Sequence, residues 1–393
     1  MKTASAFSVS AGGEAVREAL DALAGKLADK PDILFLYTTQ HHASPDLLDA
    51  ITARLPGVPV VGGTSCGGVM TEAGFHTGPD GALGLFGICD ANGSYGVGAA
   101  EIGTSPQAAG AAAIRAALAS AGRDFETPTL VWCCQPPGHE EGVIEGIQSV
   151  IGATTPIIGG SSADEAIAGE WRQFSPDGVT SAHAVVAALF PTSAHGAAFQ
   201  SGYAPTEHTG VVTKAEGRQI LEIDHQPAAT LYSQWTGGEV SATEAGMILA
   251  KSTATPLGRI AAEVKGVPMF VLSHPSLLGL GGDLSLFTDI AEGDQVHLMR
   301  GSSDSLVKRG GVVVADACAA GGWAKDATAG GLVIYCGGCM LHVRERMDEV
   351  VAGVRDAIGD APFLGAHTFG EQGAIMDNCN RHGNLMVSAL TFG

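Results

Sequence analysis

The chain has 393 residues, 45% of them hydrophobic and 16% charged, so it is long enough for two domains and apolar enough for packed cores. A formal net charge of −20 argues against nucleic-acid binding and against anionic membrane surfaces, which both need clustered Lys and Arg. No apolar run suits a membrane helix, no signal-peptide pattern is present and the eight cysteines form no disulfide framework. We therefore expect a cytoplasmic protein with reduced thiols and no membrane insertion.

The first predicted elements are an amphipathic helix and a β–α–β unit whose second strand ends in glycines. Two strands and an alanine-rich helix follow this unit. In chain order these elements are the helix 14–27, the strand 33–37, the helix 44–55, the strand 58–61, the exit Gly62-Gly63-Thr64-Ser65-Cys66-Gly67, the strands 83–89 and 95–98, and the helix 105–121.

The β–α–β unit recurs twice further along the chain. The second copy consists of the strand 129–134, a helix ending at 150, the strand 155–158 and the exit Gly159-Gly160-Ser161-Ser162-Ala163-Asp164. The third copy consists of the strand 332–336, the helix 341–358, the strand 361–364 and an exit that runs from Gly365 to Glu371. Between them, residues 211–232 indicate two strands and a helix, and residues 268–272 and 311–315 indicate strands.

The repeat predicts where a ligand site would lie. The two strands of a β–α–β unit are parallel neighbours, so the loop and the exit of each copy emerge at one carboxyl edge, where open α/β sheets bind ligands. We predict an α/β fold of two domains built from duplicated β–α–β units with mixed sheets. The first domain covers residues 1–222, with copies at about 31–104 and 127–202 related by an approximate two-fold, and the second covers 223–393. Chance recurrence of this common unit is the alternative.

Five segments, taken in order, carry a resemblance to a known family. They are Pro59 to Gly67, Pro156 to Asp164, Lys214 to Ala228, the tract at Cys336, and Phe369-Gly370-Glu371-Gln372-Gly373. Together they resemble the FIST (F-box and intracellular signal transduction) family, in the order of its N-terminal and C-terminal domains. The likeness extends from about Pro31 to Gly373.

The resemblance implies an intracellular module that senses a small polar ligand such as an amino acid or carboxylate. In bacteria such modules often work with histidine kinases, chemoreceptors or cyclic-dinucleotide enzymes, and some members bind haem. No such output segment is present in this sequence, so the expected partners are the small-molecule ligand and a separate signalling protein. The resemblance supplies no catalytic motif, and we expect a protein without enzymatic activity.

The exits form the main candidate ligand site because their backbone N–H groups and hydroxyls can cradle an anion. Glycine packing without a ligand is the alternative. The candidate residues are Gly63, Thr64, Ser65, Cys66, Gly160, Ser161, Ser162 and Asp164. His139, Glu140, Glu141 and Glu371 add charge at the same edges, and Glu371 is the strongest because it belongs to the resemblance. We expect exits from both domains to wall one pocket, with Glu371 opposite Ser65 or Ser162.

Cys66 offers a catalytic alternative. It ends the first copy, while His41 and His42 follow the neighbouring strand, so a thiolate–imidazole pair could act as the nucleophile of a hydrolase of small amides, esters or lactones. Cys336 and Cys339 form a C-x-x-C for which structural, redox and zinc roles stay open, although no second ligand pair completes a metal site. We predict no metal and no cofactor. Haem is the remaining alternative, with His41, His42, His139 or His367 as ligands.

Overall fold

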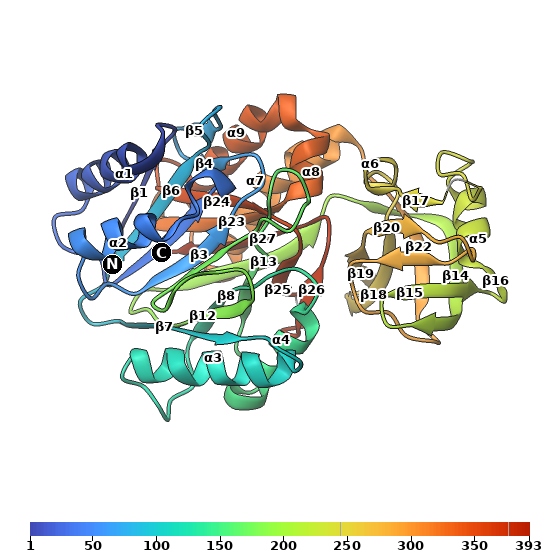
Figure 1. Cartoon of the computed structure of the whole chain (residues 1–393), viewed down its shortest axis with the longest axis horizontal. Helices are drawn as coiled ribbons and strands as arrows, with labels where there is room; N and C mark the ends of the chain where they lie inside the picture. Colours follow the sequence, from blue (N-terminus) through green and yellow to red (C-terminus); the bar gives the residue numbers. More distant parts are fainter. Residues whose placement is uncertain (244, 376) are drawn as a thin grey trace.

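Residues 1–243, 245–375 and 377–393, which the computed structural model describes, form a mixed α/β protein with four sheets. Figure 1 shows a large body of three sheets and their helices beside a smaller, mostly β lobe. The three sheets of the large body are six-stranded, and each contains one of the predicted β–α–β units with its two strands parallel. The three predicted β–α–β segments are therefore present, one in each sheet.

The first unit begins with a strand and a helix that precede the predicted β–α–β segment. Its sheet has the order β1-β6-β2-β3-β10-β11. The chain passes through β1 (Lys2–Ser8), α1 (Gly12–Lys26), β2 (Ile33–Thr38), the 3-10 turn Gln40–His42, α2 (Pro45–Arg54), β3 (Val60–Thr64), β4 (Val69–Thr71), β5 (Gly74–His76) and β6 (Leu83–Cys89).

The second unit repeats this order of elements, and its sheet has the order β26-β25-β9-β8-β12-β7. The chain passes through β7 (Ser94–Glu101), α3 (Pro106–Ser120), β8 (Leu130–Cys134), α4 (Glu140–Ile151), β9 (Ile157–Gly160), β10 (Gln173–Ser175), β11 (Gly178–Thr180) and β12 (His183–Phe190).

The third unit has the sheet order β13-β27-β23-β24-β4-β5 and is interrupted by the β lobe after its first strand. Its expected helix at 341–358 is divided into α8 and α9 by a 3-10 turn. The elements are β13 (His195–Ser201), α7 (Ser303–Gly321), the 3-10 turn Lys325–Ala327, β23 (Gly330–Cys336), α8 (Gly337–His342), the 3-10 turn Arg344–Arg346, α9 (Met347–Ile358), β24 (Phe363–Thr368), β25 (Glu371–Ala374), β26 (Asn380–Gly383) and β27 (Met386–Phe392).

The strand predicted at 311–315 is wrong, because these residues lie inside α7. Ser302 begins this helix with a capping box to Ser305, and Gly322 ends it in the left-handed conformation. Leu306, Val313 and Val314 are buried against the third sheet. The tertiary burial of one helix face therefore overrides the β propensity of the valine run.

The three units exchange hairpins in a ring. The hairpin after β3 joins the sheet of unit three, the hairpin after β9 joins the sheet of unit one, and the hairpin after β24 joins the sheet of unit two. Each glycine-rich exit is thus the point where the chain leaves one sheet and enters the next. The exits are held together by pairing that no local pattern specifies.

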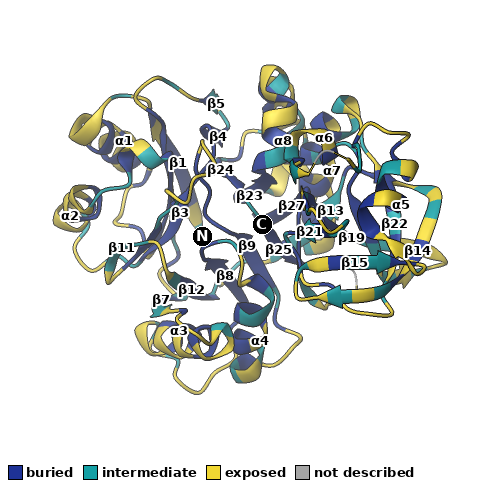
Figure 2. Cartoon of the chain, turned by 45° about the vertical axis from the view of Figure 1, so that its right-hand side comes forward, coloured by how far each residue is buried: buried dark blue, intermediate teal, exposed yellow. Residues whose placement is uncertain are grey.

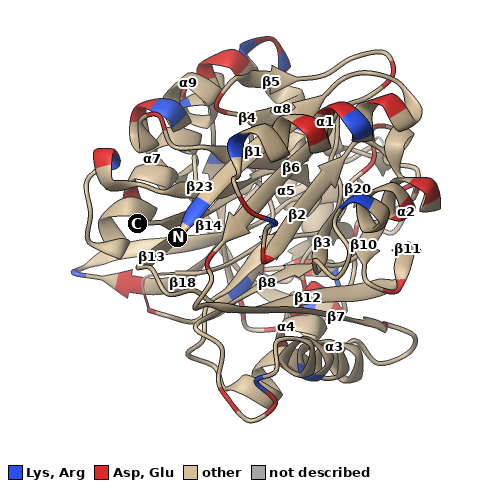
Figure 3. Cartoon of the chain, turned by 90° about the vertical axis from the view of Figure 1, so that its left-hand side faces the viewer, with Lys and Arg blue, Asp and Glu red and all other residues tan. Residues whose placement is uncertain are grey.

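The inner faces of the three sheets share one core, while helices cover their outer faces. Phe35 of β2 packs edge-on against Trp132 of β8 with ring centroids 5.6 Å apart, and Leu332 and Phe392 of the third unit join the same cluster. Figure 2 shows the buried sheets inside and the exposed faces of α1, α2 and α3 outside. Figure 3 shows that charged residues lie mostly on helices and loops. Within the described residues, no helix is both long and apolar enough to span a bilayer.

The β lobe has one nine-stranded sheet and its own core, which includes Tyr232 and Trp235. The two strands and the helix predicted within residues 211–232 are present. The domain boundary expected at residue 222 would fall within β15. The elements are β14 (Ala204–Glu216), β15 (Gln219–Ile223), β16 (Gln226–Pro227), α5 (Ala228–Trp235), β17 (Gly246–Met247), α6 (Leu249–Ser252), β18 (Leu257–Val264), β19 (Val267–Ser273), β20 (Pro275–Leu278), β21 (Leu284–Leu286) and β22 (Gln295–Arg300).

Candidate functional site

The three exits meet in the centre of the large body and bond to one another through their backbones. In this ring, Cys66 N donates to His367 O at 3.0 Å, Ala163 N to Thr64 O at 2.9 Å, and Phe369 N to Ser161 O at 3.1 Å. The structure therefore brings the predicted segments together. Their side chains are buried, so the meeting point is a closed polar core.

The glycines of the exits permit this close approach. A Cβ on Gly62 would lie 1.8 Å from the Leu36 carbonyl oxygen, and one on Gly159 would lie 1.9 Å from that of Cys133. Gly63 and Gly160 face the adjoining units, where Ser162 Oγ and Thr368 would be 2.3 Å and 2.6 Å from an added Cβ. The packing alternative thus has a direct physical basis at these four positions.

The polar side chains of the exits bond within the protein. Ser65 Oγ donates to Gly68 O at 2.6 Å and accepts from His367 N at 2.8 Å. Ser162 Oγ lies 3.2 Å from Cys134 Sγ, and the Asp164 carboxylate accepts from the backbone N–H groups of the loop 168–170. Ligand contact by the exit residues stays a prediction, and their observed partners are internal.

Glu371 lies beside the second exit, in register with Gly160 across the β25–β9 pair. Its carboxyl group is fully buried and accepts bonds from Thr368 Oγ1 at 2.9 Å and Met386 N at 3.0 Å. Burial raises the pKa of Glu371 well above its usual value. A carboxyl group with this environment is held neutral more readily than a surface glutamate.

The environment of Cys66 is unfavourable for nucleophilic catalysis. Its thiol is buried, and desolvation raises its pKa to about 12, so little thiolate forms at neutral pH. Among the described residues, no hydrogen bond joins Cys66 to His41, which is exposed, or to His42, which is buried with Nε2 unpartnered. Cys336 and Cys339 are also buried as free thiols, while His139 is exposed at the start of α4.

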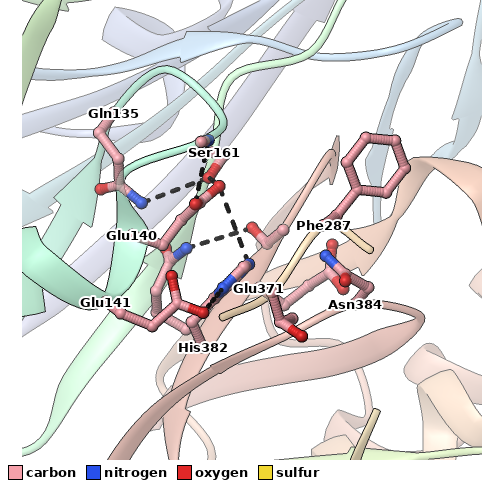
Figure 4. Close-up of polar contacts among 12 residues, drawn as sticks. Gln135, Glu140, Glu141, Ser161, Phe287, Glu371, His382 and Asn384 are labelled. Atoms are coloured by element: carbon pink, nitrogen blue, oxygen red, sulfur yellow. Dashed lines mark hydrogen bonds and ion pairs between the residues drawn. The ribbon is translucent and has the colours of Figure 1, made fainter. Parts of the chain in front are cut away.

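A charged cluster lies where the β lobe meets the second unit, as Figure 4 shows in close-up. Glu140 and Glu141 come from the first turn of α4, and His382 comes from β26. Arg218 reaches them from the turn between β14 and β15. Sequence analysis noted the two glutamates at a carboxyl edge but missed Arg218 and His382, which carry no local signal.

Arg218 has four partners, two in the large body and two within its own β lobe. Its Nη2 donates to Glu140 Oε2 at 2.9 Å and to Glu141 Oε2 at 2.5 Å. Its Nε donates to Asp289 at 2.8 Å and its Nη1 to Phe287 O at 2.6 Å. Burial would lower the pKa of Arg218, but Glu140 and Glu141 raise it above its usual value. The guanidinium therefore stays charged inside the interface.

His382 completes the cluster from the opposite side. Its Nδ1 lies 3.0 Å from Glu141 Oε1, and its Nε2 lies 3.8 Å from Glu140 Oε1. Burial lowers the pKa of His382, but the two carboxylates outweigh burial and raise it. Burial also opposes ionisation of Glu141, yet His382 and Arg218 hold the pKa of that carboxyl well below its usual range.

A cavity of about 500 Å³ opens beside this cluster, between the β lobe and the second unit. It has four carboxylates, two guanidinium groups and an imidazole around a partly apolar wall. Its lining residues are Glu141, Ile144, Glu145, Gln148, Arg259, Ile260, Ala261, Val271, Asp289, Asp294, Asn380, Arg381 and His382. The exits do not contribute to it. The cavity is large enough for a small metabolite.

Comparisons with known proteins place the chain in a family. Two solved cyanuric acid hydrolase structures are structural matches with low TM-scores. The enzyme from A. caulinodans has a TM-score of 0.39 and 11% identity, and a second structure, described as an evolutionary innovation by structural concatenation, has a TM-score of 0.37 and 10% identity. Both matches cover 100% of this chain and 99% of the other. No curated protein sequence matches significantly. The FIST N domain matches residues 32–226 and the FIST C domain matches residues 228–374, so the chain belongs to the FIST family.

Proposed function

We propose that the protein is a sensory protein that binds a small metabolite carrying both an amine and a carboxylate. The cavity between the β lobe and the second unit is the proposed binding site. The main support for this site is the lining of the cavity, in which charged groups of both signs lie around the apolar side chains of Ile144 and Val271. Membership of a family of sensory domains supports this function.

Two cavity residues have free capacity for such a ligand. Arg259 donates from Nη1 to Asp294 at 3.1 Å, while its buried Nε has no partner. A ligand carboxylate at Nε would satisfy this donor with a charge-assisted hydrogen bond. Glu145 lies on α4 across the cavity and, within the described part of the chain, accepts one hydrogen bond, from Gln107 Nε2 at 3.3 Å, so it can receive an ammonium group.

The site also offers a route to signal output. Its wall is built from α4 and β26 of the large body and from β18 and β19 of the β lobe. A ligand held between Arg259 and Glu145 would contact both bodies and so favour one of their relative positions. A separate signalling protein would read that position.

Calorimetric titration with three matched ligand sets tests the proposal. The sets are amino acids, the amines that lack their carboxylate, and the acids that lack their amine. We expect only the amino acids to bind with substantial affinity, because both charges are needed. A ligand at 100 times its Kd should stabilise the protein by about 2.7 kcal/mol.

Arg259→Gln and Glu145→Gln should each weaken binding at least about tenfold, the effect of roughly 1.4 kcal/mol of lost interaction. Arg115→Gln is the matched control, because Arg115 is exposed on α3 and does not line the cavity. Equal binding by the three ligand sets, or equal loss in all three variants, would contradict the proposal.

A further inference from the structure

We propose that a first-row divalent cation binds between His382 Nε2 and Glu140 Oε1, next to the cavity. This inference does not depend on the proposed metabolite with an amine and a carboxylate. The cation site and the metabolite site can each be refuted without the other. It starts from an unsatisfied atom: the His382 side chain is fully buried, yet Nε2 has no hydrogen-bond partner. A buried ring nitrogen without a partner is costly, and it faces a carboxylate oxygen 3.8 Å away.

The distance suits a shared ion better than a hydrogen bond. An ion at about 2.1 Å from both atoms would bridge 3.8 Å with an open angle of roughly 130°, which zinc-type sites with nitrogen and oxygen ligands accommodate. The ligand atoms of Glu140, Glu141 and His382 all lie within 4.8 Å of one another. Glu141 is therefore close enough to support the two ligands from the outer shell.

Glycine leaves the region between the two atoms open. A Cβ at Gly370 would lie 2.5 Å from His382 Nε2 and 3.1 Å from Glu140 Oε1. Any larger residue would therefore fill the gap. Gly370 belongs to the third exit, and the lack of a side chain there keeps the proposed ion position free.

The surrounding bonds resemble the outer shell of a metal site. Metal-binding histidines usually direct their second nitrogen to a carboxylate, and Glu141 Oε1 occupies that position on Nδ1 at 3.0 Å. Ser161 Oγ donates to Glu140 Oε1 at 2.8 Å. Arg218 binds the Oε2 atoms of both glutamates, so it orients them without blocking the Oε1 atom that faces Nε2.

Ligand chemistry and charge select the class of ion. An imidazole with carboxylates favours Zn²⁺, Mn²⁺ or a similar first-row ion over Mg²⁺ or Ca²⁺, which prefer oxygen ligands alone. With neutral His382, the two glutamates and Arg218 sum to one negative charge. A divalent cation therefore meets a favourable field. His382 and Glu141 also line the cavity, which provides the entry path.

The test is titration of the chelator-treated, full-length protein with Zn²⁺ and, separately, with Co²⁺, whose visible absorption reports nitrogen and oxygen coordination. Cys379 is exposed and could bind these ions adventitiously, so every variant carries Cys379→Ser. Mg²⁺ serves as the comparison ion. We expect one Zn²⁺ per chain and no saturable Mg²⁺ binding in the same range.

His382→Gln and Glu140→Gln should each weaken Zn²⁺ binding more than about 100-fold, and Glu141→Gln by about tenfold, as for outer-shell partners. His139→Gln is the control, because His139 is exposed next to Glu140. Gly370→Ala should block the ion position while both ligand residues remain in the chain, so it tests the position without removing a ligand group. Circular dichroism verifies folding of each variant. Unchanged binding in the folded His382 or Gly370 variants would mean an adventitious ion only and would overturn the inference.

Discussion

Arg218→Met tests whether one guanidinium couples the β lobe to the large body. The substitution keeps an apolar side chain of similar length and removes the charge and all four donated bonds. Glu140 is 1% exposed, so it would lose its direct ion-pair partner inside the interface. Removing one partner of a buried pair costs about 3–5 kcal/mol. Because His382 still faces Glu140, we expect the lower end of this range.

A second arginine supplies a matched control. Arg346 also binds two carboxylates, those of Asp304 and Glu349, but these partners are 72% and 56% exposed. Exposed pairs contribute about 0–1 kcal/mol because water and salt screen them. Arg346→Met should therefore cost at least about 2 kcal/mol less than Arg218→Met.

Urea unfolding and limited proteolysis of the β lobe measure the two effects. The double variant of Arg218→Met with Glu140→Gln should recover part of the loss, because the neutral amide no longer needs a counter-charge. A coupling energy of about 1–3 kcal/mol is expected for such neighbours. Equal destabilisation by Arg218→Met and Arg346→Met, or strict additivity in the cycle, would refute the reasoning.

Three further predictions concern the exits and the buried titratable groups. Gly62→Ala places a Cβ 1.8 Å from a carbonyl oxygen and should lower the free energy of unfolding by more than about 4 kcal/mol. Gly25→Ala on α1, where the added Cβ has no neighbour within 4 Å, should raise it by about 0.5–1 kcal/mol. Similar melting temperatures of the two variants would contradict this. Burial lowers the pKa of His274 and His367 to about 4. The folded protein therefore has its full stability from the neutral form of these histidines above pH 6.5 and loses it as the pH falls towards 4. A folded His274→Gln variant should lose about 2 kcal/mol less stability between pH 8 and pH 5 in urea unfolding than the unsubstituted protein, and an equal loss would exclude this cause. Cys66 should resist a thiol reagent at pH 8 until the protein unfolds, and labelling in the native state, read by peptide mass spectrometry, would revive the hydrolase alternative.

The sequence predicted the local units well because their pattern and geometry are local. The strand at 33–37, the helix at 44–55 and the exit at 62 correspond to β2, α2 and the end of β3. Gly62 and Gly159 recur because a parallel neighbour's carbonyl oxygen approaches both positions within 2 Å of where a Cβ would lie. Such a constraint is visible in one chain without any knowledge of distant pairing.

The arrangement of the units could not be predicted in the same way. The pairing of Gly62 with Phe174 and of Gly159 with Gln372 joins segments that are far apart in the chain. Hairpin exchange follows from these pairings, and the flanking residues carry no signal for them. Arg218 and His382 were missed for the same reason, since each becomes notable only beside the first turn of α4.

The number of units also explains why the exits do not leave an open site. Two β–α–β units would present two polar edges, with hydroxyls and N–H groups free for a ligand. Here a third unit closes the ring, so Cys66, Thr64 and Ser161 find backbone partners in the adjoining exits. Polar atoms that are satisfied internally gain little from a ligand. Among the buried atoms without a partner, His367 Nε2 is enclosed within the third exit, whereas Arg259 Nε and His382 Nε2 belong to residues that line the cavity between the β lobe and the second unit. Binding capacity in this protein is therefore expected at the junction of the inserted lobe, where both of these nitrogen atoms belong to residues that line a cavity.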